Sequence, residues 1–174
     1  MRIKRTYTLV RFLAIVGVLL SALLFGNSAY AQQHPPRPFS IYTTPAQGLF
    51  FGAFYHGNAG GTVIIFPDGS RSTTGDVIQA SLGFQFSPAI IEVEAAAGTR
   101  INIMNGSNST LTGSNGGFMT LQVGTSDPAV PFIITSSPPA RTQVRIGGTL
   151  YVGNSLANPV GAYSGQFNVT FVQE

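Results

Sequence analysis

Alternation of apolar and polar residues, continued through most of the chain, is the feature that most constrains how this sequence can fold. Ile91, Val93 and Ala95 alternate with Glu92 and Glu94, and the same period of two recurs at 100–103, 119–123, 143–152 and 163–171. This period puts one face of each strand on a core and the other in water. From Gly48 onward no ten residues show the 3.6-residue period of a helix, so the sequence predicts an all-β domain.

Turn signals separate the alternating segments. In Pro67-Asp68-Gly69, proline fixes φ, the aspartate can bind its own backbone, and glycine can take the left-handed conformation. Further loops are predicted at 58–61, 105–106, 113–117, 138–139 and 158–159. About eight or nine short antiparallel strands with this spacing predict an immunoglobulin-like β-sandwich, and a barrel is the alternative.

Four segments carry more specific expectations. The runs Leu49 to Tyr55 and Val63 to Phe66 are apolar on both faces, which predicts a central position or cover by another chain. The polar tract from Asn105 to Asn115 is predicted to be an exposed loop. Gly147-Gly148 lies within a strand pattern and predicts a β-bulge.

The N-terminus has the layout of a secretory signal peptide. Basic residues up to Arg11 precede a 14-residue apolar run at 12–25, and Ala29-Tyr30-Ala31 supplies a small-x-small cleavage site. Spanning a bilayer takes about 20 residues, so we expect cleavage after Ala31 rather than an uncleaved anchor. The expected organisation is a signal peptide at 1–31, a Pro-rich leader at 32–47 and a β-sandwich domain at 48–174. A short strand is predicted in the leader, through Phe39-Ile41-Thr43.

Charge is sparse, and removal of the signal peptide changes its sign. The whole chain carries a formal charge of +3, but the part from Gln32 onward has five arginines, six acidic residues and no lysine. Five scattered arginines cannot form the clustered basic surface that binds phosphates, which excludes nucleic acid as a partner. We expect a protein of the periplasm or cell surface of a bacterium, with no membrane span after signal cleavage.

Catalytic and metal-binding constellations are not evident in the sequence. The chain has no cysteine, and its two histidines, His34 and His56, belong to no metal-ligand spacing. His56 is expected in a loop near a turn. Glu92 and Glu94 lie about 7 Å apart on one strand face, which is the ordinary pattern of a solvated sheet. The sequence therefore predicts no catalytic residue, no cofactor and no metal site.

A set of short motifs resembles one bacterial family. The ordered motifs resemble the secreted bacterial domain of unknown function 4402 family, which is similar to spore-coat-U-like and chaperone–usher pilin domains. The resemblance implies a pilin-like sandwich without an assigned activity. The motifs are Phe51-Gly52-x-Phe54, Gly60-Gly61-Thr62-Val63, Pro67-Asp68-Gly69, Ser87-Pro88-Ala89, Gly147-Gly148-Thr149-Leu150 and Gly161-x-Tyr163-x-Gly165-x-Phe167-x-Val169-Thr170.

The last predicted strand, 162–172, carries most of what the resemblance implies. A glycine followed by apolar residues at alternate positions is similar to the end of pilin subunits, which pairs first with a periplasmic chaperone and then with a neighbouring subunit. Main-chain hydrogen bonds supply the affinity in such pairing, and alternate side chains fill pockets. The candidate strand-pairing residues are Gly161, Tyr163, Gly165, Phe167, Val169 and Phe171, and Gly165 is expected to permit a close approach or a bulge.

The function expected from these observations is that of a secreted, non-catalytic structural protein of the bacterial cell surface, such as a fimbrial or adhesion-related subunit. The alternative is a monomeric binding module that recognises a glycan or surface partner through its polar loops.

Overall fold

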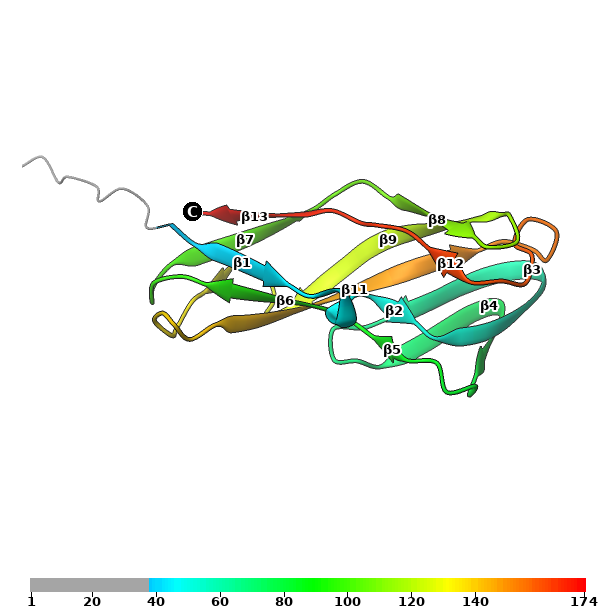
Figure 1. The fold of residues 1–174 in the computed structure, drawn as a ribbon, viewed down its shortest axis with the longest axis horizontal. Coiled ribbons are helices and arrows are strands. Elements are labelled where there is room, and N and C mark those ends of the chain that lie inside the picture. Colours follow the sequence, from blue (N-terminus) through cyan, green and yellow to red (C-terminus); the bar gives the residue numbers. More distant parts are fainter. Residues whose placement is uncertain (1–37) are drawn as a thin grey trace, which may run out of the picture. The chain divides into compact units, whose positions relative to one another are not determined.

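The computed structural model describes residues 38–174, and every β-ladder in this part of the chain is antiparallel (Figure 1). Among these residues no helix is long and apolar enough to cross a membrane. The predicted signal peptide and its cleavage site lie outside the described residues. The elements are β1 (Ser40–Thr43), the 3₁₀ turn η1 (Pro45–Gln47), β2 (Phe50–Phe51), β3 (Ala53–Ile65), β4 (Arg71–Ala80), β5 (Phe86–Ser87), β6 (Ala89–Glu94), β7 (Arg100–Asn105), β8 (Ser109–Gly113), β9 (Phe118–Asp127), β10 (Phe132–Ile133), β11 (Thr142–Val152), β12 (Tyr163–Ser164) and β13 (Val169–Gln173).

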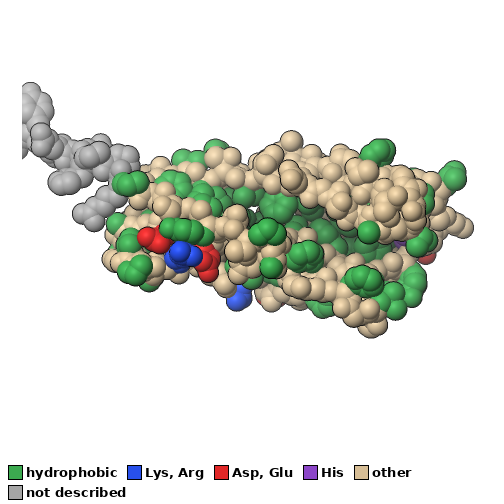
Figure 2. All heavy atoms as spheres, in the orientation of Figure 1, with side chains coloured by type: hydrophobic (Ala, Val, Ile, Leu, Met, Phe, Trp, Pro, Cys, Tyr) green, Lys and Arg blue, Asp and Glu red, His purple; other side chains and the backbone are tan. Residues whose placement is uncertain are grey.

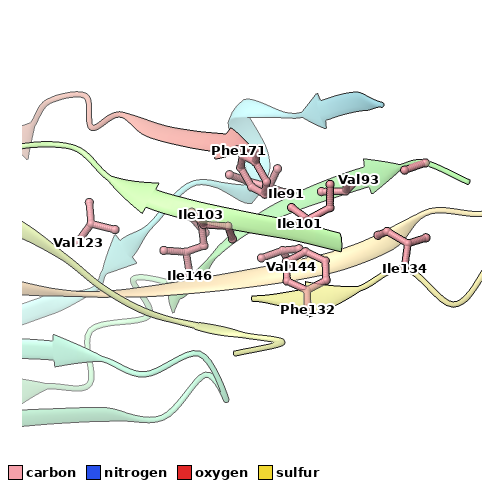
Figure 3. Close-up of a cluster of buried hydrophobic side chains, with 12 residues drawn as sticks. Ile91, Val93, Ile101, Ile103, Val123, Phe132, Ile134, Val144, Ile146 and Phe171 are labelled. Atoms are coloured by element: carbon pink, nitrogen blue, oxygen red, sulfur yellow. The ribbon is translucent and has the colours of Figure 1, made fainter. Parts of the chain in front are cut away.

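One half of the domain is a two-layer sandwich. One layer has the strand order β1-β6-β11-β9, and the other has the order β10-β7-β13. Buried side chains from β6, β9 and β11 pack there against those from β7, β10 and β13, as the close-up in Figure 3 shows. Ile101 and Val144 are completely enclosed between the layers. The predicted β-sandwich is thus confirmed, although with more strands than the eight or nine expected.

The other half is built around a bent hairpin of β3 and β4. Arg71 Nε donates to Gln79 Oε1 at 3.3 Å, and Gln79 Nε2 donates to the carbonyl oxygen of Arg71 at 3.2 Å. Eight residues apart on a straight strand, these two would be separated by about 26 Å. The hairpin is therefore folded back on itself, and it encloses a second core between β3, β4, β8, β9 and β11.

Glycines permit this bend. The pairing of β3 with β4 shifts register between His56 and Gly61, and Gly60 and Gly75 have φ angles of +70° and +65°. A side chain on Gly61 would collide with the carbonyl oxygen of Thr74 on the facing strand. Two predictions are corrected here: 58–61 is a bend inside the single strand β3, rather than a loop between strands, and His56 lies in that strand.

The alternating segments are buried on the expected faces. Residues 89–94 of β6 alternate strictly between buried and half-buried positions, and β7, β9 and β11 bury the predicted isoleucine, leucine, methionine and valine side chains. The pairing of β11 with β9 shifts register between Ile146 and Gly148, which confirms the predicted bulge. The Val63 to Phe66 run lies centrally between β11 and β4, as one of its two predicted alternatives required.

The polar tract is only partly a loop, and the leader is part of the main sheet. The tract from Asn105 to Asn115 contains β8, which buries Leu111, so only part of it is the predicted exposed loop. A single leucine among threonines and serines is too short a signal for a strand. The predicted strand in the leader is confirmed as β1, which pairs with β6, so the sheet reaches into the segment expected to precede the domain.

The Pro67-Asp68-Gly69 turn forms as predicted and allows a pH-dependent test. The amide and hydroxyl of Ser70 donate to Asp68 Oδ1 at 2.8 and 2.6 Å, and the bond from the hydroxyl is the larger cause of a lowered pKa for Asp68. A lowered folded-state pKa adds stability above the unfolded value, and this stability is lost as pH falls through the folded value. We expect Ser70→Ala to raise the pKa of Asp68 toward its ordinary value, as measured by carboxyl NMR titration. An unchanged titration would contradict this assignment of the hydroxyl.

A candidate strand-pairing site

The predicted last strand is split between the two halves of the domain. Tyr163 and Ser164 form β12 and pair with β8, whereas 169–173 form β13 and pair with β7. The intervening residues belong to no strand. The prediction of one continuous strand over 162–172 is therefore wrong, because the segment crosses from the sheet that contains β8 to the sheet that contains β7.

The alternation along this segment nevertheless has the predicted orientation. Phe171 is buried, and Tyr163, Phe167 and Val169 are half-buried, whereas the residues between them from Ser164 to Thr170 are exposed. Two core clusters, the one between the two layers and the one enclosed by the β3–β4 hairpin, meet at this segment. Phe167 packs against both.

Two glycines bring the segment close to its neighbours. A side chain on Gly165 would come within 2.6 Å of the carbonyl oxygen of Thr110, which confirms the predicted close approach. A side chain on Gly161 would meet the hydroxyl of Ser114 at 2.7 Å. Glycine at these positions lets the chain lie directly against β8 and the turn that follows it.

The C-terminal segment, from β12 to β13, forms one wall of a gap between strands. We call this gap the seam. The opposite wall is the run from β1 to the first half of β3. Within residues 38–174 no β-ladder joins the two walls, since β1 pairs only with β6, β2 with β5, and β13 with β7. Figure 2 shows a hollow between these walls, with hydrophobic side chains visible inside it.

Half-buried apolar side chains line the seam from both sides. Leu49 lies over the backbone of β11, because a side chain on Gly148 would meet its Cδ2 at 2.7 Å. Like Phe167, Leu49 packs against both core clusters. The seam therefore borders both cores of the domain. Its lining residues are Phe39, Leu49, Phe54, Tyr163, Phe167 and Val169.

Charge is absent along most of the C-terminal wall. Residues 146–173 include no acidic or basic side chain. At the end of β13, Glu174 pairs with Arg100 at 2.8 Å, and both side chains are largely exposed. An apolar strand could thus lie against this wall without removing a charge from water, which is the step that makes buried ionic groups costly.

Glu92 and Glu94, the two carboxylates on β6, bind an arginine that also contacts β1. Arg141 reaches Glu92 at 2.9 Å and Glu94 at 3.5 Å, and its guanidinium carbon lies 3.6 Å from the centroid of the Tyr42 ring. The hydrogen bond to Glu92 is the main cause of a raised pKa for Arg141. This clamp fixes β1 on β6 even though none of the four β1 residues is buried.

The remaining candidate groups are not brought together. His56 lies on β3 with Nδ1 3.4 Å from the oxygen of Gly57, and His34 is outside the described residues. In the part of the chain from residue 38 onward, no three His, Asp or Glu side chains are grouped to hold a metal ion. The sequence did not predict that Phe39, Leu49 and Phe54 would face the last segment. The apolar character of the Leu49 to Tyr55 run was the available signal.

Comparison with known families supports the resemblance drawn from the motifs. A family model described as Domain of unknown function (DUF4402) matches residues 41–172. The chain belongs to this family. The match to the domain of unknown function 4402 family extends from β1 to β13, so it includes both walls of the seam. No curated protein and no solved structure matches the chain.

Proposed function

We propose that this protein is a secreted, non-catalytic structural component of the bacterial cell surface, of the fimbrial or adhesion-related kind, that assembles with other subunits by strand pairing along the seam. The observation that carries this proposal is the seam itself. Two unpaired strand edges border an apolar hollow, and exposed strand edges are templates for pairing with another chain.

The chemistry of the seam supports a strand as its occupant. On its C-terminal wall, the apolar lining residues Tyr163, Phe167 and Val169 belong to one alternating set of positions, which matches the alternate side chains of an added strand. A periplasmic chaperone that covers these edges before assembly is part of the same proposal, because an uncovered apolar edge promotes aggregation. The polar tract offers less to the alternative, a glycan-binding module, since β8 takes up part of it.

A matched pair of charge substitutions tests the seam. Phe167→Glu places a charge among the lining residues, whereas Gln166→Glu adds the same charge at the exposed neighbouring position. We expect protein exported to a bacterial periplasm and purified from there to form concentration-dependent oligomers by light scattering. Phe167→Glu should abolish them, and Gln166→Glu should leave them unchanged.

The fold of each variant is checked by circular dichroism and urea unfolding before assembly is compared. A wild-type protein that stays monomeric at every concentration, and that binds no peptide with alternating apolar residues, would contradict the proposal and favour the monomeric binding module.

A further inference from the structure

The ladder between β13 and β7 decides which main-chain groups of the C-terminal wall point into the seam. The amide of Gly106 donates to the carbonyl oxygen of Asn168 at 2.9 Å, and the amide of Glu174 donates to that of Arg100 at 3.1 Å. Both bonds fit the register of the ladder, in which hydrogen-bonded pairs alternate with non-bonded pairs. The even-numbered residues of this wall therefore bond to β7. The residues whose N–H and C=O groups point away from β7 are Val169, Phe171 and Gln173.

The opposite edge of β7 gives the same assignment. The amide of Ile134 donates to the carbonyl oxygen of Thr99 at 2.8 Å, in register with the ladder between β10 and β7. Odd-numbered residues of β7 thus bond toward β10, which leaves its even-numbered residues for β13. The outer edge of β13 is therefore a row of main-chain donors and acceptors at every second residue.

The groups on this outer edge have no main-chain partner within residues 38–174, because β13 pairs with β7 alone. Phe171 keeps only 9% of its surface in contact with solvent. Main-chain N–H and C=O groups at buried positions are almost always hydrogen-bonded in folded proteins. The unpaired groups at Phe171 therefore mark a position that gains hydrogen bonds from an added strand.

The free edge continues into β12. The amide of Ser114 donates to the carbonyl oxygen of Ala162 at 2.8 Å, in register with the ladder between β12 and β8, so the main chain of Tyr163 points away from β8. Between the two strands, residues 165–167 make no main-chain hydrogen bond to the described part of the chain. The free edge thus keeps one period of two from β12 to β13, although the paired edge is divided between β8 and β7.

We propose that an extended strand of a partner chain fills the seam by pairing antiparallel with this free edge, through the main-chain groups of Val169, Phe171 and Gln173. This inference rests on the proposed function, and it names the edge and the atoms that the added strand uses. The added strand becomes the fourth strand of the layer β10-β7-β13, which then equals in number the strands β1-β6-β11-β9 of the other layer. Antiparallel pairing is the more stable arrangement per residue, and it is the one that both ladders of this layer use.

The geometry of the edge specifies the partner strand. Residues that exchange hydrogen bonds across an antiparallel pair lie opposite each other and direct their side chains to the same face. Since the side chain of Phe171 is buried in the core, the partner residue opposite to it also points inward and must be apolar. That residue must also have an amide hydrogen. The partner therefore carries apolar residues other than proline at alternate positions.

This requirement excludes the Pro-rich leader of another copy as the partner. Pro35 and Pro36 are adjacent, so one of them falls on a bonded position in either register. Proline has no amide hydrogen to donate to a ladder.

Amide hydrogen exchange, followed residue by residue with NMR, tests the assignment. In the dilute monomer, the amides of Val169, Phe171 and Gln173 should exchange faster than those of Thr170 and Val172, which bond to β7. In oligomers that are quenched and dissolved in dimethyl sulfoxide before the spectra are recorded, the first three amides should exchange about tenfold more slowly or less. Thr170 and Val172 are the internal controls, because their amides are bonded in both states.

Two N-methylated peptides test the direction of the added strand. The probe is a short peptide of alternating valine and serine, added to the dilute monomer. Methylation of the valine amides should weaken its binding by roughly 100-fold, since each lost hydrogen bond contributes a factor of about five. Methylation of the serine amides is the matched control and should change the affinity by no more than about twofold. A larger effect of serine methylation than of valine methylation would overturn the antiparallel pairing.

The exchange experiment separates this inference from the proposed function. Oligomers in which the amides of Val169, Phe171 and Gln173 exchange as fast as in the monomer would overturn the inference and leave assembly through another edge. A wild-type protein that neither assembles nor binds the peptide would instead contradict the proposed function itself.

Discussion

Replacing Gly60 with alanine is expected to lower the free energy of unfolding by about 3 kcal/mol. Gly60 has a φ of +70°, which costs an L side chain roughly 1–2 kcal/mol. An added Cβ would also collide with the carbonyl oxygen of Val152 and approach the backbone of Gly153 to 2.9 Å. Since both neighbours are backbone, they cannot move aside without disturbing the strand that packs next to the bend. Urea unfolding monitored by circular dichroism measures the loss.

The matched control is Gly69→Ala in the turn that follows β3. Gly69 also has a positive φ, of +89°, but a side chain there would meet nothing within 4 Å. This variant should lose only the conformational part, about 1–2 kcal/mol. Equal losses for the two variants would show that close packing at the bend contributes nothing to stability.

Phe171→Ala is expected to destabilise the protein by about 3–5 kcal/mol, the usual range for truncating a buried phenylalanine. Phe171 lies on β13 and packs in the core between the two layers (Figure 3). Total stabilities are typically about 5–15 kcal/mol, so this one side chain decides whether β13 stays in place. The measurement is the urea midpoint at constant m-value.

Thr170→Ala is the control for this prediction. Thr170 is the exposed neighbour on the same strand and keeps the same ladder with Met104. It should change stability by less than about 0.5 kcal/mol, as surface substitutions commonly do. A similar loss in both variants would mean that backbone pairing, rather than burial of the ring, holds β13.

The positions of the glycines show where sequence patterns are informative and where they are ambiguous. Gly147-Gly148 interrupts an alternating pattern, and the bulge followed from that local fact. The glycines at 57–61 look like a loop in the sequence, yet the chain continues through them as one strand that bends. Both interpretations fit the local residues, and the pairing with β4 decides between them.

The seam likewise cannot be predicted from the sequence of either wall alone. The last segment alternates as a strand should, and its apolar positions were assigned correctly. Its division into β12 and β13, however, depends on which strand lies beside each part, and β8 and β7 come from distant positions in the chain. Leu49 is one apolar residue among several until the fold places it over Gly148.

The sequence by itself determined the all-β class, the buried faces of β6, β7, β9 and β11, the tight turn at Asp68 and the close approach at Gly165. Each of these depends on side-chain period, backbone freedom or hydrogen bonds within a few residues. Only the tertiary structure decided the folding back of β3 and β4, the crossing of the C-terminal segment between sheets, and the unpaired edges that border the seam. These features depend on contacts between residues far apart in the chain. A local sequence pattern does not indicate which other strand will lie beside it.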